Sequence, residues 1–394
     1  MPISKNIKSN LERSSWIRKM FEQGAKLKQK HGQENVFDFS LGNPDLPSPQ
    51  EFNQELKKQA KKTGSYLHGY MPNSGYPENR EKIAEKLSKE SGLHFDKNLV
   101  TMTVGAAGAM NVALKSILNP GEEVIVFTPY FVEYDFYIQN HQGKKVEVST
   151  TDDLLPDFKE LQEKISSNTR AVIINSPNNP TGRIYPKDCL QELGEILAQK
   201  SRELNRSIYL LADDPYSKIV YSDAEYRTPL KYYDNTLMIR SFSKDLSLAG
   251  ERIGYLGISP KADDSEDLIK AASFTNRTLG FVNAPALMQR VIQNVLDVHV
   301  DVEKYEERKN VLYDSLTDIG YNIVEPQGTF YMFPKSPIAD DIKFVNELQE
   351  ELILVTPGTG FHKSGYFRIS LCLPLEKIKR ALPGFEKAYQ NSVQ

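Results

Sequence analysis

Four short runs of apolar, β-branched residues stand out in the middle of the chain. They cover residues 124–128, 171–175, 208–212 and 236–239, and most are separated by stretches with helical periodicity. A continuous apolar run of this length is typical of a strand that is buried on both faces. The pattern predicts an α/β fold with a mostly parallel sheet flanked by helices.

The pattern changes after about residue 285. An amphipathic stretch over residues 286–317 predicts one long helix, and shorter alternating runs at 321–325, 329–333 and 367–371 predict strands. A helical pattern over residues 16–30 is expected to pack back on these elements. We therefore expect a large cofactor-binding domain over residues 46–284, and a smaller α+β domain formed by both chain ends, residues 1–45 and 285–394.

Composition narrows the class of partner. The 49 Lys and Arg residues nearly balance 52 Asp and Glu residues, so no positive field favours nucleic acid or anionic lipid. Two cysteines, Cys189 and Cys372, are too few for a disulfide framework and lack metal-ligand spacing. We find neither an apolar run approaching about 18 residues nor the apolar core of a signal peptide. We expect a cytoplasmic protein with a small substrate, no metal, and no nucleic-acid or membrane partner.

Each buried run is followed by residues that are suited to chemistry. Open α/β sheets bind ligands outside the carboxyl ends of their strands, so these residues are expected to meet at one edge. They are Pro129-Tyr130-Phe131, Ser176-Pro177-Asn178-Asn179-Pro180-Thr181-Gly182, Asp213-Asp214-Pro215-Tyr216 and Ser241-Phe242-Ser243-Lys244.

The segment 241–255 reads SFSKDLSLAGERIGY and is the strongest signal. Partial burial lowers the pKa of a lysine and favours imine formation at Lys244. The hydroxyl groups of Ser241 and Ser243 and the planar fork of Arg252 are suited to a phosphate dianion. An isolated lysine is more often a solvated surface residue, but this context favours the chemical interpretation.

Four other segments are ambiguous by themselves. The runs 213–216 (DDPY) and 178–182 (NNPTG) both have the composition of an ordinary turn, and the first also offers two carboxylates. The run 103–110 (TVGAAGAM) places small residues at an expected helix start over 109–118, where free N–H groups favour an anion. Arg368 lies in an alternating strand, where a charge is costly unless it is paired.

Together these segments resemble the signatures of class I/II aminotransferases, which are fold-type I pyridoxal-phosphate enzymes of the aspartate aminotransferase superfamily. The resemblance covers essentially the whole chain, and it implies a seven-stranded type of sheet in the large domain. It also implies that Lys244 holds pyridoxal 5'-phosphate as a Schiff base and shuttles a proton. The expected reaction moves an amino group between an L-amino acid and a 2-oxo acid by a ping-pong mechanism, with Asp213 and Tyr216 as further catalytic residues.

The resemblance also implies the remaining roles, residue by residue. Asp213 is preferred to Asp214, which is expected to be a capping or structural residue, and Asn179 is preferred to Asn178. Tyr70, in YMPNSG, is expected to reach the phosphate of a neighbouring subunit, which implies a homodimer with shared sites. The cofactor contacts are Gly105, Ala106, Ala107, Phe131, Asn179, Asp213, Tyr216, Ser241, Ser243, Lys244, Arg252 and Tyr70, and the substrate contacts are Gly42 (in SLGNPD), Asn179 and Arg368.

Two alternatives and one open question remain. A carbon–sulfur β-lyase of the same fold would use nearly the same residues. The ligand-sensing domain of a transcription regulator is less favoured, because the residues before Gly42 leave no room for a helix-turn-helix extension. Side-chain specificity stays open between a distal carboxylate site at Arg277 and an apolar pocket lined by Tyr66, Tyr331, Phe361 and Ile17.

Overall fold

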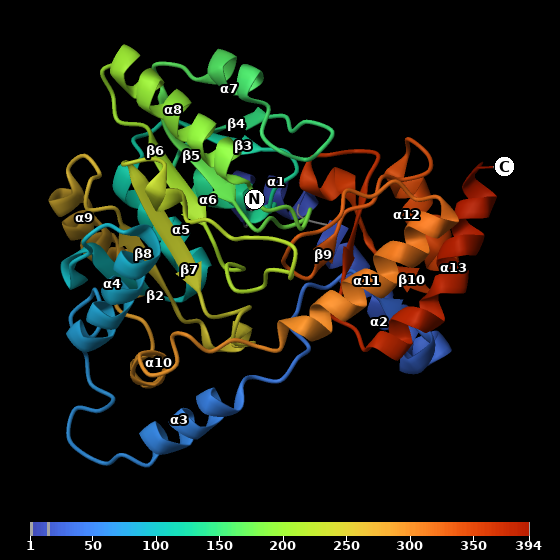
Figure 1. Ribbon diagram of the computed structural model, residues 1–394, viewed down its shortest axis with the longest axis horizontal. Coiled ribbons are helices and arrows are strands. Elements are labelled where there is room, and N and C mark those ends of the chain that lie inside the picture. The colour runs from blue at the N-terminus through green and yellow to red at the C-terminus, as the bar shows by residue number, and fades with distance from the viewer. Residues whose placement is uncertain (1–2, 14–15, 394) are drawn as a thin grey trace.

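A seven-stranded sheet forms the centre of the larger of two bodies in the computed structural model, which describes residues 3–13 and 16–393 (Figure 1). The strand order is β2-β8-β7-β6-β5-β3-β4. Neighbouring strands from β4 to β7 are parallel, whereas β8 runs antiparallel to both β7 and β2. The expected mostly parallel α/β sheet is confirmed. The strands are β2 (Val100–Thr103), β3 (Glu123–Phe127), β4 (Lys144–Val148), β5 (Thr169–Asn175), β6 (Tyr209–Asp213), β7 (Thr236–Ser241) and β8 (Gly254–Ile258).

Helices cover both faces of this sheet, which explains why its parallel strands read as continuous apolar runs. Successive residues of a strand point to opposite faces. Val124 and Val126 pack with α5 (Gly105–Ile117), α6 (Glu133–Asn140) and α9 (Ser265–Thr278). Ile125 and Phe127 pack with α4 (Pro77–Ser91), α8 (Lys187–Glu203) and α10 (Ala286–Ile292). Two further helices, α3 (Gln50–Ala60) and α7 (Phe158–Lys164), complete this part of the chain.

The smaller body contains segments from both ends of the chain, as expected. In Figure 1, α2 (Trp16–His31) lies beside the C-terminal helices α11 (Val302–Ile319) and α13 (Leu375–Val393). A Cβ atom at Gly24 of α2 would lie 2.9 Å from the Leu354 side chain, so the helix packs closely on this body. Its other elements are β1 (Phe37–Asp38), β9 (Tyr331–Met332), α12 (Asp341–Glu350), β10 (Ile353–Leu354), β11 (Thr356–Pro357) and β12 (Phe367–Ser370), and a short helix α1 (Lys5–Arg13) comes first in the chain.

Local sequence signals explain several helix boundaries. Pro77 stands in the first turn of α4, where its missing N–H group is not needed. Gly92 ends α4 with a φ of +77°, and Gly320 ends α11 with a φ of +118°, a backbone conformation that favours glycine.

The single helix expected over residues 286–317 is wrong. The structure has two helices, α10 and α11, separated by residues 293–301. The amine of Lys218 donates to the carbonyl oxygens of Leu296 and Val298, and the N–H group of Val300 donates to the carbonyl oxygen of Asp245. Tertiary hydrogen bonds therefore replace helical ones across this linker.

Strand expectations in the small body are only partly correct. Residues 321–325 form no strand, because their described backbone bonds, such as Lys335 N–H to Asn322 O, do not build a ladder. The strand expected over 329–333 is reduced to β9, and that over 367–371 to β12. The strand-like sequence of residues 99–104 corresponds to β2, whereas strands β1, β4, β8, β10 and β11 had no matching prediction.

The predicted domain boundaries stay a prediction, and the hydrophobic cores favour a change to one of them. Met288, Val291 and Leu296 belong to the core of the large sheet, although they follow residue 284. After Leu296, the next residue along the chain that belongs to a hydrophobic core is Val300, and it lies in the core of the small body. A second boundary near residue 300 fits this packing better than one at residue 285.

We predict that Gly194→Ala destabilises the large domain, although alanine normally favours a helix. Gly194 lies in α8, and a Cβ atom there would fall on the backbone carbonyl of Tyr232. We expect overpacking to cost about 1–3 kcal/mol in the free energy of unfolding, measured with a chemical denaturant. Gly250→Ala is the control, since a Cβ atom at Gly250 meets no atom within 4 Å. Equal stability of the two variants would contradict the packing argument.

Candidate active site

A cavity of about 380 Å³ lies where the carboxyl ends of the parallel strands meet the small body. Residues that follow β2, β3, β5, β6 and β7 line one side, and Tyr331 and Arg368 of the small body line it as well. The lining residues are Ser40, Leu41, Gly42, Ala106, Ala107, Met110, Phe131, Tyr134, Tyr137, Asn175, Asn179, Asp213, Pro215, Tyr216, Ser241, Ser243, Lys244, Ala249, Arg252, Tyr331 and Arg368.

Lys244 places a largely buried amine in this cavity. Its Nζ atom donates to the carbonyl oxygen of Gly42 at 3.2 Å. Burial lowers the pKa of Lys244 to about 8, and the positive charges of Arg368 and Arg252 act in the same direction. The fraction of neutral, nucleophilic amine near pH 7 is therefore far larger than for a surface lysine.

Asp213, the last residue of β6, places a carboxylate in the same cavity. Its Oδ2 atom accepts a hydrogen bond from the hydroxyl group of Tyr134 at 2.5 Å, while Oδ1 is buried without a partner among the described residues. The side-chain amide of Asn175 donates to the backbone carbonyl of Asp213 at 2.7 Å. Burial raises the pKa of Asp213 to about 7. One carboxylate oxygen is thus held and the other is available to a ligand.

Asp214 lies outside this cavity. Its carboxylate accepts from Nε of Arg240 and from the hydroxyl group of Tyr226, both at 2.7 Å. Of the two adjacent aspartates, only Asp213 lines the cavity, and Asp214 is paired on the other side of the strand end.

Asn179 and Arg368 contact each other within the cavity. The Nη1 atom of Arg368 donates to Oδ1 of Asn179 at 3.0 Å, and Nη2 donates to the carbonyl oxygen of Ser40 at 2.8 Å. Its Nε atom is buried without a partner among the described residues. The guanidinium carbon lies 4.5 Å from the ring centre of Tyr331 and 4.7 Å from that of Phe361. An arginine fixed in this way still has donors for a carboxylate.

Gly42 and Tyr216 contact the same aromatic side chain. A Cβ atom at Gly42 would lie 2.5 Å from Cζ of Tyr331, so a larger residue has no space there. The rings of Tyr216 and Tyr331 meet edge to face with centres 6.0 Å apart. Burial raises the pKa of Tyr216 well above its usual range, so its hydroxyl group stays protonated and remains a donor.

The start of α5 and Arg252 form one end of the cavity, and their N–H groups and positive charge are suited to an anion. Ala106 and Ala107 line the cavity in the first turn of α5, where N–H groups lack helical partners. Gly105 is not in the cavity wall, but a Cβ atom on it would lie 2.9 Å from the Arg252 guanidinium. Arg252 itself has a φ of +50° and donates to the carbonyl oxygen of Ala249. Ser241 and Ser243 line the same cavity.

Of the residues named from the sequence, Tyr70 lies outside the cavity of its own chain. Its side chain is 93% exposed, and that of Tyr66 is 91% exposed. Arg277 does not line the cavity either; its guanidinium lies over the ring of Phe274 on α9. Phe361 is buried behind Arg368, and the side chain of Ile17 lies outside the described residues.

The sequence reasoning missed Tyr134, Tyr137, Asn175 and Met110. Asn175 carried a usable signal, because it is a polar residue at the end of an apolar run. Tyr134 follows Phe131 at helical spacing, yet its bond to Asp213 spans 79 positions and left no pattern in the sequence. Among the described residues, no group of three metal-ligating side chains is present, and no helix is long and apolar enough to cross a membrane.

Comparison with known proteins identifies the family. A model of the family described as aminotransferase class I and II matches residues 34–385. An aspartate aminotransferase of Pyrococcus horikoshii is 33% identical over 391 residues, which cover 97% of this chain and 96% of that protein. An aspartate/prephenate aminotransferase of Thermus thermophilus is 32% identical over 360 residues, which cover 88% and 89%. An aminotransferase crystal structure from Eubacterium rectale is 39% identical, with a TM-score of 0.97 and full coverage of both chains.

These names all denote amino-group transfer, and they do not favour the β-lyase alternative. The match covers most of the chain, and the confirmed mostly parallel sheet agrees with the fold that the resemblance implied. The protein is thus an aminotransferase of fold type I and belongs to the class I and II aminotransferase family.

Proposed function

We propose that this cavity binds pyridoxal 5'-phosphate and transfers an amino group between an L-amino acid and a 2-oxo acid by a ping-pong mechanism. One observation carries the proposal: the largely buried amine of Lys244 and the buried Oδ1 of Asp213, which has no partner among the described residues, line the same cavity. One cavity serves both half-reactions, so the first oxo acid leaves before the second one binds.

The residues present fit this cofactor. Lys244 would hold it through its amine, and the free Oδ1 of Asp213 would accept from the protonated ring nitrogen. Asn179 and Tyr216 would donate to the phenolic oxygen, and Phe131 would stack on the ring. The phosphate would be held by the start of α5 and by polar side chains around it, namely Gly105, Ala106, Ala107, Ser241, Ser243 and Arg252.

When bound, pyridoxal 5'-phosphate accepts the electron pair that remains when the α-hydrogen of the substrate leaves as a proton. The residues of the chain do the rest. Asp213, held by Tyr134, keeps a negative charge against the ring nitrogen. Lys244 takes the proton and returns it, because its lowered pKa suits both directions near neutral pH.

The α-carboxylate of the substrate would be bound by Arg368, with Gly42 and Asn179 beside it. Aspartate is the donor to test first, because several relatives are named aspartate aminotransferases. Arg277 would meet a distal carboxylate only in the site of a partner chain, since it lies outside the cavity of its own.

We predict that the loaded enzyme converts L-aspartate and 2-oxoglutarate to oxaloacetate and L-glutamate in equal amounts, measured by chromatography. Arg368→Met should raise KM for the donor about 10- to 100-fold, because a charged hydrogen-bond pair is lost. Arg277→Met is the matched arginine variant, because Arg277 is exposed and lies outside the cavity of its own chain. A rise in KM for aspartate but not for alanine in this variant would indicate a distal carboxylate site at Arg277. Release of ammonia and pyruvate from cystathionine or cysteine, without an oxo acid, would instead identify a carbon–sulfur β-lyase.

We predict that capture of added pyridoxal 5'-phosphate by the cofactor-free chain accelerates with pH and levels off above about pH 8. Only the neutral amine reacts, and the pKa of Lys244 is lowered to about 8. Borohydride reduction followed by peptide mass analysis should place the covalent label on residue 244, and Lys244→Ala should lose it. Capture that keeps accelerating to pH 10, as for N-acetyl-lysine, would contradict a lowered pKa.

We further propose a homodimer in which Tyr70 reaches the cavity of the partner. The segment between α3 and α4 carries Tyr66 and Tyr70 with almost fully exposed rings, and α3 stands apart from the sheet in Figure 1. Exposed large aromatic side chains are common where a surface contacts another chain. We also propose a cytoplasmic location, which suits two unpaired cysteines.

We predict that a hybrid dimer of a Lys244→Ala chain and a Tyr70→Ala chain is more active than either parent. If sites are shared, one site of the hybrid carries both defects and the other carries neither, which gives about half of the wild-type activity per dimer. Two affinity tags allow the hybrid to be purified and assayed. Activity no higher than half of the Tyr70→Ala homodimer would show that each chain builds its own site.

A further inference from the structure

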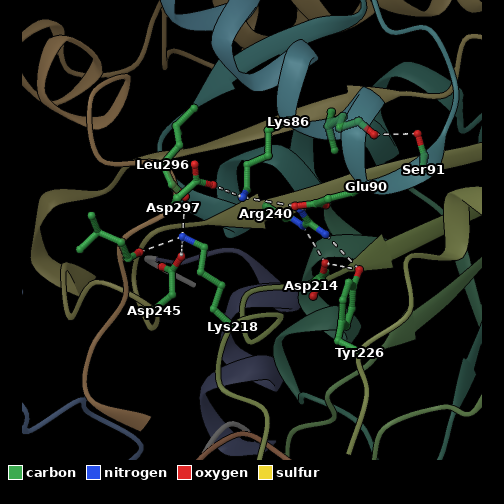
Figure 2. A network of polar contacts seen from close by, with 12 residues as sticks. Lys86, Glu90, Ser91, Asp214, Lys218, Tyr226, Arg240, Asp245, Leu296 and Asp297 are labelled. Atoms are coloured by element: carbon green, nitrogen blue, oxygen red, sulfur yellow. Dashed lines mark hydrogen bonds and ion pairs between the residues drawn. The ribbon is translucent and has the colours of Figure 1, made fainter.

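Charged side chains form a buried network behind the cavity, between α4 and the sheet (Figure 2). Arg240 of β7 donates to Asp214 at 2.7 Å and to Glu90 at 2.6 Å. Lys218 lies in the same network beside Asp245. The acidic residues that directly follow Asp213 and Lys244 are therefore both held on this side.

The amine of Lys218 meets three acceptors. Its Nζ atom lies 2.6 Å from the carbonyl oxygen of Leu296, 2.9 Å from that of Val298, and 3.3 Å from Oδ2 of Asp245. A lysine ammonium has three N–H donors, so these contacts use all of them. Lys218 is largely buried, and Asp245 is buried as well, which makes each charge dependent on the other.

The two carbonyl groups belong to the linker 293–301, which carries the chain from the large sheet to the small body. Leu296 lies in the hydrophobic core of the large sheet, and Val300 lies in the core of the small body. Carbonyl groups outside helices and strands need other partners when they are buried. Lys218 supplies that partner just before the chain leaves the large domain.

The contacts of Lys218 extend to the residue next to Lys244. Asp245 follows Lys244 directly, its carboxylate contacts Lys218, and its backbone oxygen accepts from the N–H group of Val300 at 2.7 Å. Lys218 also stands two residues after Tyr216. Three segments therefore meet at one amine: the loop after β6, the lysine loop after β7, and the linker.

We propose that Lys218 is a positioning residue for transamination, which fastens the interdomain linker to the loop of Lys244. The small body carries Arg368, so a fixed linker keeps that guanidinium in register with the amine of Lys244. The kinetic part rests on the proposed binding of the substrate carboxylate by Arg368. The structural part, a linker held by Lys218, is independent of it.

The experiment uses Lys218→Met and the double variant Lys218→Met/Asp245→Asn in the full-length holoenzyme. The single variant leaves a buried carboxylate without its cation, which lowers stability. The double variant removes that charge and recovers stability, yet the Leu296 and Val298 carbonyl groups still lack the amine. We expect amide hydrogen exchange of the linker to rise about tenfold in both variants. We also expect KM for the amino donor to rise about three- to tenfold, with a smaller change in kcat.

Two controls separate this role from a purely structural one. Asp297→Asn changes a residue of the same linker and breaks its ion pair with Lys86 of α4. The Asp297 side chain is 92% exposed, so we expect no measurable change in exchange or KM. Asp245→Asn alone keeps both carbonyl contacts of Lys218 and should leave linker exchange within about twofold of wild type. The proposal is overturned if exchange and KM recover in the double variant together with its melting temperature, or if Asp297→Asn loosens the linker equally. If exchange rises without a change in KM, the linker is held by Lys218 but does not position Arg368, which also overturns the proposal.

Discussion

Removal of ionisable groups from water is the constraint on which this site depends. Burial disfavours the charged form of both Lys244 and Asp213, so it lowers the pKa of the amine and raises that of the carboxylate. The two values, about 8 and about 7, both fall near neutral pH. A bound cation at the free oxygen of Asp213 would oppose the effect of burial, because it favours the carboxylate. Cofactor binding and the ionisation of Asp213 are therefore coupled.

Two adjacent aspartates at the same sheet edge differ in whether a cation neutralises their charge. Asp213 faces the cavity with one oxygen left free, while Asp214 is matched by Arg240 and Tyr226. Successive residues at the end of a strand point to opposite sides, so a D-D pair naturally divides in this way. The paired aspartate still acts on its neighbour, since its negative charge helps to raise the pKa of Asp213. The network behind the cavity thus influences the chemistry in front of it.

Much of the fold and of the cavity could be predicted from the sequence, because both depend on local patterns. Apolar runs gave the central strands, and the residues that follow them met at one edge because parallel strands share their direction. The failures were non-local. In the linker where a helix was expected, Leu296 is bound by Lys218, which lies 78 positions earlier in the sequence. The hydrogen bond from Tyr134 to Asp213 likewise joins separate elements. Periodicity carries no information about such partners. The short strands β1 and β10 also exist only through their mutual pairing.

The two chain crossings between the bodies converge on the lysine loop. The first crossing contains Gly42, whose carbonyl oxygen accepts from Lys244, and the second contains Val300, which donates to the next residue, Asp245. A rotation of the small body has to move both crossings, because they are its covalent connections to the sheet. Lys244 and Asp245 are therefore in direct contact with both crossings. Arg368 belongs to the small body, so a carboxylate bound there, as proposed, would act on the environment of the amine through these crossings without touching that amine.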